Sequence, residues 1–162
     1  MRVFGIDPGS LVTGFGVIEE EANRLRAVAW GAVRTSATQP LPERLKRIYE
    51  GLAEPLRTWQ PDAVSVERVF FAENPKTALT LGHARGVALL SVAHANLPLV
   101  EYSALEIKMA VVGYGRAAKS QVQQMVKHLL RLEVLPQPVD AADALAAAIC
   151  HAHTQGLWRR LS

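Results

Sequence analysis

The chain has 162 residues, of which 49% are hydrophobic and 20% are charged, and this composition argues for one folded domain and against disorder. Its richest apolar stretch, Gly86 to Ala95, is shorter than the roughly 20 residues that a membrane span needs, and it contains Ser91 and His94. The single cysteine, Cys150, excludes an internal disulfide and a cysteine-based zinc site. We therefore expect a protein without a membrane segment that works in the reducing cytoplasm.

The first third of the chain predicts a small group of strands followed by a helix. The turn Pro8-Gly9-Ser10 joins the first two strand-like runs, which we expect to pair antiparallel. Leucine and isoleucine then recur at spacings of three and four from Leu41 to Leu56, the stripe of an amphipathic helix. Pro55 is expected to kink or end that helix. The expected strands cover residues 2–7, 12–19 and 25–35.

The rest of the chain alternates between strands and helices. Asn74-Pro75 is a good N-cap and first-turn pair for a long apolar helix. Apolar residues from Val122 to Leu130 at i, i+3, i+4, i+7 and i+8 mark a further helix. This order of elements predicts an α/β domain, with a mixed sheet flanked by helices. The remaining expected elements are strands over 63–67 and 97–102 and helices over 75–95, 104–112 and 139–155.

The net charge of +3 comes entirely from the second half of the chain. Residues 1–81 hold ten basic and ten acidic side chains, whereas residues 82–162 hold eight and five. Such an excess indicates either a solvated helical face or a phosphate-binding surface. Five basic residues fall between Glu106 and Glu133, where there is no acid: Lys108, Arg116, Lys119, Lys127 and Arg131.

Four acidic residues stand at positions where carboxylates are unusual. Asp7 and Glu67 each end an apolar strand, and Asp140 and Asp143 share one face at the start of an alanine-rich helix. Separately, an Asp-Pro-Gly turn accounts for Asp7, and helix capping with dipole compensation accounts for the last two. Together at one end of a sheet, the four would repel one another unless cations lay between them. Oxygen ligands suit Mg²⁺ or Mn²⁺, and two such ions can activate water against a phosphodiester, which favours phosphodiester hydrolysis.

Four short motifs carry a resemblance to a known family. Gly5-Ile6-Asp7-Pro8-Gly9-Ser10, followed by Thr13-Gly14-Phe15-Gly16-Val17, resembles the opening of the RuvC Holliday junction resolvases. Val66-Glu67-Arg68-Val69-Phe70 is similar to the second motif of that family. Lys119-Ser120-Gln121-Val122-Gln123 and Asp140-Ala141-Ala142-Asp143-Ala144-Leu145-Ala146 resemble its later blocks, so the resemblance runs from residue 3 to about 155.

The resemblance implies a ribonuclease H-like fold over residues 1–156, followed by a short basic tail over 157–162. It implies a homodimer that resolves four-way DNA junctions by paired symmetric nicks in recombination and repair, with Mg²⁺ or Mn²⁺, two ions per active site. The RuvA–RuvB branch-migration complex is the implied protein partner. By motif match the catalytic, metal-binding residues would be Asp7, Glu67, Asp140 and Asp143.

The same resemblance implies DNA contacts by residues other than the four acids. Lys108 and Lys119 match lysines that meet the DNA near the cut, and we place Arg116 on the same surface. Phe70 and Phe71 would form an aromatic wedge that stacks on a base at the junction centre, a contact worth about 1–3 kcal/mol per base. The alternative for this aromatic pair is a hydrophobic anchor that folds the loop onto the domain.

Two smaller features have structural explanations as well. The helix with Gly82 and Gly86 is either a close-packed dimer axis or an apolar core helix. His151 and His153 lack companion ligands for zinc, so we expect a helix-surface or packing role for them.

Two other functions compete with junction cleavage. The opening glycine motif also fits an actin-like phosphotransferase or ATPase, but that class needs two related lobes and the chain has room for one. A non-catalytic junction-binding module is the other possibility, and the presence of all four acids argues against it.

Overall fold

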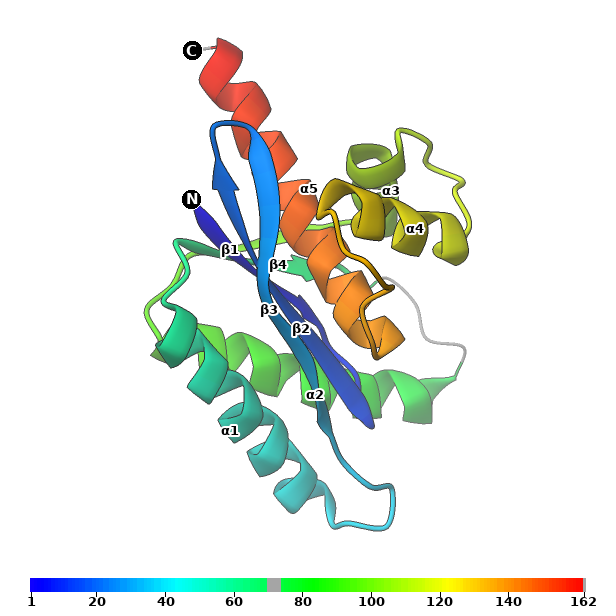
Figure 1. The fold of residues 1–162 in the computed structure, drawn as a ribbon. Coiled ribbons are helices and arrows are strands. Elements are labelled where there is room, and N and C mark those ends of the chain that lie inside the picture. Colours follow the sequence, from blue (N-terminus) through cyan, green and yellow to red (C-terminus); the bar gives the residue numbers. More distant parts are fainter. Residues whose placement is uncertain (70–73, 162) are drawn as a thin grey trace.

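Five strands form one mixed sheet in the order β3-β2-β1-β4-β5 (Figure 1). The structure is a computed structural model; it describes residues 1–69 and 74–161, the last four by their backbone only. β1 pairs antiparallel with β2, as the sequence predicts, and β2 with β3, whereas β1–β4 and β4–β5 are parallel pairs. The mixed sheet of the predicted α/β domain is therefore confirmed. The strands are β1 (Arg2–Asp7), β2 (Val12–Glu21), β3 (Arg24–Arg34), β4 (Ala63–Glu67) and β5 (Leu99–Tyr102).

Helices cover both faces of this sheet (Figure 1). Strand side chains such as Phe4, Ile6 and Val66 pack with α1 and α2 in one core, and Val3 and Ile18 face the other three helices in a second core. Alternate residues of β1 thus serve opposite faces, as the two-residue period of a strand requires. The first layer consists of α1 (Leu41–Trp59) and α2 (Pro75–His94), and the second of α3 (Ala104–Val112), α4 (Lys119–Leu129) and α5 (Val139–Leu161).

Helix α5 lies directly on β1 and β2 because those strands present glycines to it. A Cβ atom built on Gly5 would fall 1.8 Å from the carbonyl oxygen of Ala144, and one on Gly14 would fall 2.1 Å from that of Asp140. No side chain other than hydrogen fits at these two contacts. The alanines of α5 complete the close packing, and Ala141, Ala144 and Ala148 are fully buried. The start of α5 is thereby fixed over the strand ends.

Two helices run further than the sequence predicts. Helix α1 continues through Pro55 to Trp59, so Pro55 does not end it. The hydrogen bond lost at Pro55 is offset by the burial of Leu52 and Leu56 on either side. Helix α5 continues past the expected boundary at residue 156 to Leu161, so residues 157–161 of the expected basic tail extend this helix.

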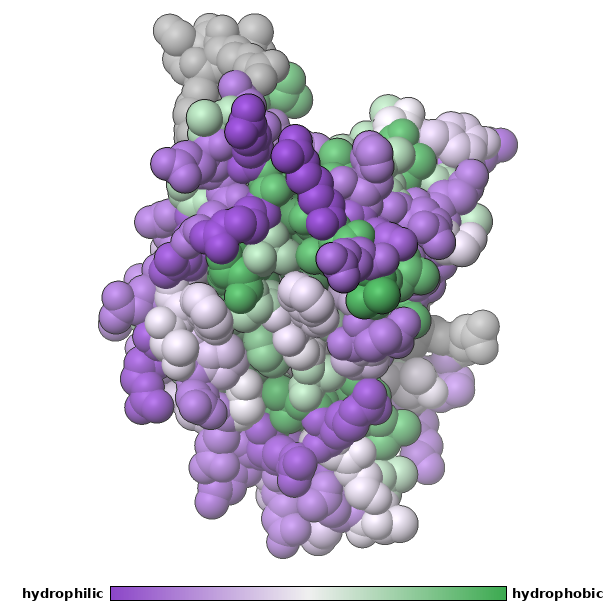
Figure 2. All heavy atoms as spheres, in the orientation of Figure 1, coloured by the Kyte–Doolittle hydropathy of each residue, from purple (hydrophilic) through white to green (hydrophobic). Residues whose placement is uncertain are grey.

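Polar and charged side chains cover most of the face seen in Figure 2, with apolar side chains in small patches between them. Among residues 1–69 and 74–161, no helix is long and apolar enough to span a membrane.

Candidate active site

The four predicted acids converge at one edge of the sheet. Asp7 and Glu67 are the last residues of the adjacent parallel strands β1 and β4, where Ile6 pairs with Val66. Parallel neighbours end at the same sheet edge, so these two acids end side by side. Asp140 lies in the first turn of α5, and its backbone lies on Gly14, the residue that pairs with Asp7 across β1 and β2. Asp143 follows one helical turn later on the same face.

The acids perturb one another electrostatically. Burial raises the pKa of Asp7 to about 7, and the negative charges of Asp143, Asp140 and Glu67 add to that rise. Burial, followed by the charge of Asp143, also raises the pKa of Glu67. The pKa of Asp143 is raised by burial although Lys119 opposes the change. Such mutual shifts among carboxyl groups are typical of sites where a cation or a proton must balance the charge.

The donor set fits a hard divalent cation. Within the described residues, no three His, Cys, Asp or Glu side chains already stand as a cage for a metal ion. Instead the ammonium group of Lys119 lies 2.6 Å from Oδ2 of Asp143 and balances part of the negative charge. The converging side chains offer carboxylate oxygens and no sulfur or imidazole. Mg²⁺ and Mn²⁺ are commonly held by one or two carboxylates together with water and substrate phosphate, so an incomplete cage suits them.

Two of the predicted basic residues line the same pocket as two of the acids. The pocket has a volume of about 220 Å³ and brings Lys108 of α3 and Lys119 of α4 beside Glu67 and Asp143. Hydrogen bonding to Asp143 raises the pKa of Lys119, which keeps this group cationic. Its side chain is 64% exposed and accessible to a ligand.

The other predicted DNA-binding residues are not among the described residues that line this pocket. Arg116 is exposed on the segment between α3 and α4 and does not line the pocket. Phe70 and Phe71 lie outside the described residues.

One residue beside the site escaped the sequence analysis. Arg85 of α2 donates from Nη1 to the carbonyl oxygen of Glu67 at 2.6 Å and from Nη2 to Oε1 of Glu101 at 2.8 Å. Its side chain is only 15% exposed. The available signal was a lone arginine within the apolar stretch of this helix, since buried guanidinium groups are rarely left unpaired.

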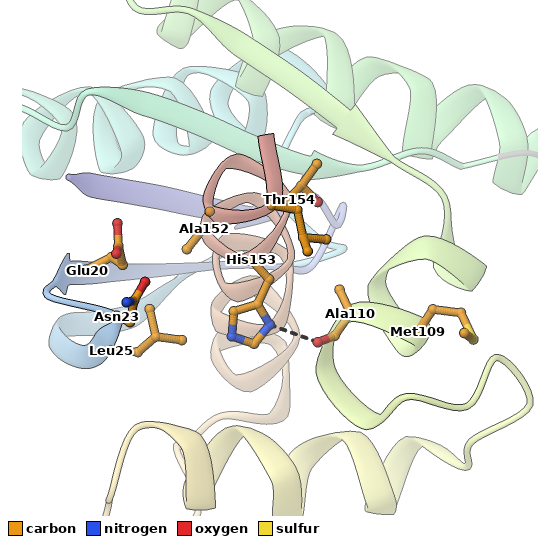
Figure 3. A pocket seen from close by; sticks show the side chains of 10 residues that line it. Glu20, Asn23, Leu25, Met109, Ala110, Ala152, His153 and Thr154 are labelled. Carbon is orange, nitrogen blue, oxygen red and sulfur yellow. Dashed lines mark hydrogen bonds between the residues drawn. The ribbon is translucent and has the colours of Figure 1, made fainter. Parts of the chain in front are cut away.

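A second concavity is lined by residues from the later part of α5, among them Ala152, His153 and Thr154 (Figure 3). Its volume is about 430 Å³, and its lining includes Glu20, Met109 and His153. Nδ1 of His153 is 2.9 Å from the carbonyl oxygen of Ala110, and the buried His151 ring lies 2.9 Å from the hydroxyl of Tyr102. Both histidines therefore have partners inside the domain, and their predicted packing role is confirmed.

Comparisons with known proteins agree with this geometry. A family model described as "Crossover junction endodeoxyribonuclease RuvC" matches residues 3–151. A RuvC of the same description from Syntrophotalea carbinolica is 57% identical over 94% of this chain and 94% of the relative, and one from Alkaliphilus oremlandii is 54% identical over 95% and 94%. The structure of Thermus thermophilus RuvC in complex with Holliday junction substrate superposes with a TM-score of 0.92 at 37% identity, covering 98% of this chain and 96% of that one.

Proposed function

This chain belongs to the RuvC family of crossover junction endodeoxyribonucleases, and we infer that it resolves four-way DNA junctions by paired symmetric nicks during recombination and repair. The observation that carries this function is the convergence of four carboxyl groups beside two lysines at one edge of a ribonuclease H-like sheet. The family match over residues 3–151 favours a junction nuclease over a phosphotransferase of the actin-like class.

We assign metal binding to Asp7, Glu67, Asp140 and Asp143, with Mg²⁺ or Mn²⁺ as the cation and two ions per active site. When bound, these ions supply an activated water for attack on phosphorus and charge neutralisation at the leaving oxygen. A pKa of about 7 means that Asp7 is roughly half protonated at neutral pH before a cation binds. Its carboxyl group must lose that proton to become a ligand, so metal binding is expected to strengthen as the pH rises through 7.

The chain itself supplies positioning and charge. Lys119 and Lys108 line the pocket beside Glu67 and Asp143, where their positive charges would attract and orient a DNA phosphate next to cations held by the acids. Binding of a cation at Asp143 would release Lys119 from its present ion pair toward the DNA. Among the described residues, no Ser, Thr or Cys lines this pocket, which agrees with water as the nucleophile. We place Arg116 on the approach to the pocket, in contact with DNA phosphates, and leave Phe70 and Phe71 as the proposed wedge.

We propose that the protein acts as a homodimer in which the α2 helices of the two copies pack against each other at the two-fold axis. Gly82 and Gly86 face open space, with no atom within 4 Å of a Cβ built on either, and Leu79 and Leu90 of the same helix are 64% and 47% exposed. Two-fold symmetry would present two identical sites to symmetry-related strands of a junction. Gly86→Leu should convert the dimer to monomer, whereas Gly156→Leu, at another helical glycine in open space, should leave it intact. Sedimentation of both variants tests this assignment.

The RuvA–RuvB branch-migration complex remains the proposed partner, and the cytoplasm the proposed location. Both follow from family membership rather than from a surface of this chain.

A synthetic four-way junction, compared with a linear duplex of the same sequence, tests the proposed function. We expect symmetric nicks in the junction with Mg²⁺ or Mn²⁺, no product with EDTA, and little cutting of the duplex. Binding of the junction without cleavage in either metal would instead identify a non-catalytic binding module.

A further inference from the structure

Arg85 is the point where the α2 layer contacts the strand end that carries Glu67. The rest of this part of α2 packs on the sheet through apolar side chains, notably Ala84, Ala88 and Val92. Arg85 reaches the strand end, where its Nη1 donates to the backbone carbonyl of Glu67 at 2.6 Å. That carbonyl belongs to the last residue of β4, so the contact fixes the strand at the position from which the Glu67 side chain departs.

Glu101 completes the arrangement from the neighbouring strand. Its Oε1 accepts from Nη2 of Arg85 at 2.8 Å, and its Oε2 lies 3.6 Å from Nε of Arg68, the residue directly after Glu67. The Glu101 carboxylate thus contacts two guanidinium groups: that of Arg85, which lies beside Glu67 in space, and that of Arg68, which follows Glu67 in sequence. The backbone amide of Arg68 also donates to the carbonyl of Tyr102 at 2.7 Å, which continues the strand pairing by one residue.

The orientation of the contacts separates this cluster from the reacting groups. Glu67 lies one residue beyond Val66, whose side chain belongs to the α1–α2 core, so the Glu67 side chain points to the opposite face, toward α5. Arg85 and Glu101 act on its backbone from the α2 side. Arg85 is therefore placed to hold Glu67 without touching substrate.

We propose that Arg85 is a positioning residue: its two-donor fork, itself oriented by Glu101, locks the end of β4 and so sets the Glu67 carboxylate against Asp7 and Asp143. This role rests on the proposed function of the acidic site. It also provides a route by which α2 influences catalysis, because Arg85 neighbours Gly86 on the helix proposed as the dimer axis. Outer-shell groups that orient metal ligands typically change metal affinity or activity by about 10–100-fold when they are removed.

Arg2 offers a matched control. Its Nη1 donates to the carbonyl of Trp59 at 2.5 Å and its side chain pairs with Glu19, so it also holds one carbonyl and one carboxylate. It lies at the start of β1, at the opposite end of the strand from Asp7. Arg85→Met and Arg2→Met therefore remove comparable contacts, and only the first removes them beside the acids.

The experiment compares wild type, Arg85→Met, Arg85→Lys and Arg2→Met in the full-length protein. Three quantities are measured: junction affinity in Ca²⁺, the single-turnover rate of junction cleavage in Mg²⁺, and hydrogen exchange at the Arg68 amide without metal or DNA. We expect Arg85→Met to bind the junction like wild type, cut it about 10–100-fold more slowly, and exchange the Arg68 amide faster. Arg85→Lys should recover only part of the rate, because an ammonium group lacks the planar fork. Arg2→Met should match wild type in rate and in exchange at Arg68.

Wild-type cleavage and exchange by Arg85→Met would overturn the proposal, as would an equal loss of rate in Arg2→Met. Full activity of Arg85→Lys would show that charge alone matters and would overturn the two-donor role. If Arg85→Met does not fold, Glu101→Gln replaces it, because it keeps the side-chain volume while weakening the ion pair that orients Arg85; unchanged rate and exchange in that variant would equally count against the proposal. Failure of wild type to cut any junction would refute the proposed function, and the exchange measurement would still decide whether Arg85 holds the strand end.

Discussion

The two ends of helix α5 both collect titratable side chains. Those at the start are carboxyl groups that interact with one another, whereas Cys150 and His151 toward the other end stay neutral. At the start of the helix, Asp140 and Asp143 join other acids whose pKa values are raised by burial and by one another. Toward its other end, burial lowers the pKa of His151 and raises that of Cys150 to about 12, so both groups stay neutral. The hydroxyl of Tyr102 supplies His151 with a hydrogen-bond partner.

The difference shows that volume is a poor guide to function in this molecule. The cavity near His153 is about 430 Å³ and the acidic pocket about 220 Å³, but His153 and Thr154 in the larger one have hydrogen-bond partners within the chain. At the smaller pocket, four neighbouring carboxyl groups meet only two lysines among the described residues, so a proton or an added cation is needed to balance the charge fully. Unbalanced charge, rather than space, marks the reactive end of α5.

The largest expected effect is on cleavage. Asp140→Asn removes a charged ligand from the reactive end and should slow junction cleavage on the order of a thousandfold, because several kcal/mol of charge stabilisation are lost. Cys150→Ser, at the other end, should leave the rate unchanged. Single-turnover rates at saturating protein measure both. Comparable losses in the two variants would erase the functional distinction between the ends.

The stability of the metal-free protein should depend on pH in opposite ways at the two ends. The folded pKa of Asp7 is above its unfolded value, so the folded state binds the proton more tightly. Its contribution to stability is complete below a pH of about 4 and is lost as the pH rises through about 7, an amount on the order of 4 kcal/mol. Asp7→Asn should therefore stabilise the protein most at pH 7.5 in EDTA.

The buried histidine has the reverse sign. Because the folded pKa of His151 is lowered, its neutral form is favoured on folding, and stability is lost as the pH falls below the unfolded value of 6.5. Urea unfolding at pH 5 and 7.5 separates the two effects. Asp7→Asn should be more stable than wild type at pH 7.5, and the destabilisation caused by His151→Gln should be smaller at pH 5 than at pH 7.5. A constant difference between wild type and Asp7→Asn across this range would contradict the assigned burial of Asp7.

The glycines under α5 give a smaller, purely steric contrast. A Cβ on Gly14 would meet the Asp140 carbonyl, so Gly14→Ala should cost about 1–3 kcal/mol and shift the start of the helix. A Cβ on Gly156 meets nothing within 4 Å, so Gly156→Ala should stabilise the helix by up to about 1 kcal/mol. Melting temperatures test both signs, and cleavage should fall only in the first variant.

The smallest expected effect is at the hydrogen bond of Tyr102. Tyr102→Phe removes the hydroxyl partner of His151 and should cost about 1 kcal/mol of unfolding free energy without changing cleavage. A strong loss of cleavage would connect the far end of α5 to the acidic pocket and would require a shared network.

The sequence predicts the strands, the helices and the four acids because each depends on local pattern. Asp7 and Glu67 interrupt apolar runs, and the spacing of Asp140 and Asp143 places them on one helical face. Arg85 could not be found this way, since its acceptor on Glu67 is a backbone carbonyl 18 residues distant, reached only after α2 has packed on the sheet. The continuation of α1 through Pro55 was also missed, because the burial of Leu56 that offsets the proline depends on tertiary contacts.

A closed-circular plasmid that extrudes a cruciform tests the central claim most directly, because its products report both the chemistry and the pairing of the cuts. With Mg²⁺, the wild-type protein should convert the plasmid to the linear form through two symmetric nicks in one binding event, and Asp7→Asn should give no product. Accumulation of nicked circles alone would contradict paired cutting by two sites. Linear product from Asp7→Asn would contradict the assignment of Asp7 to the catalytic acids.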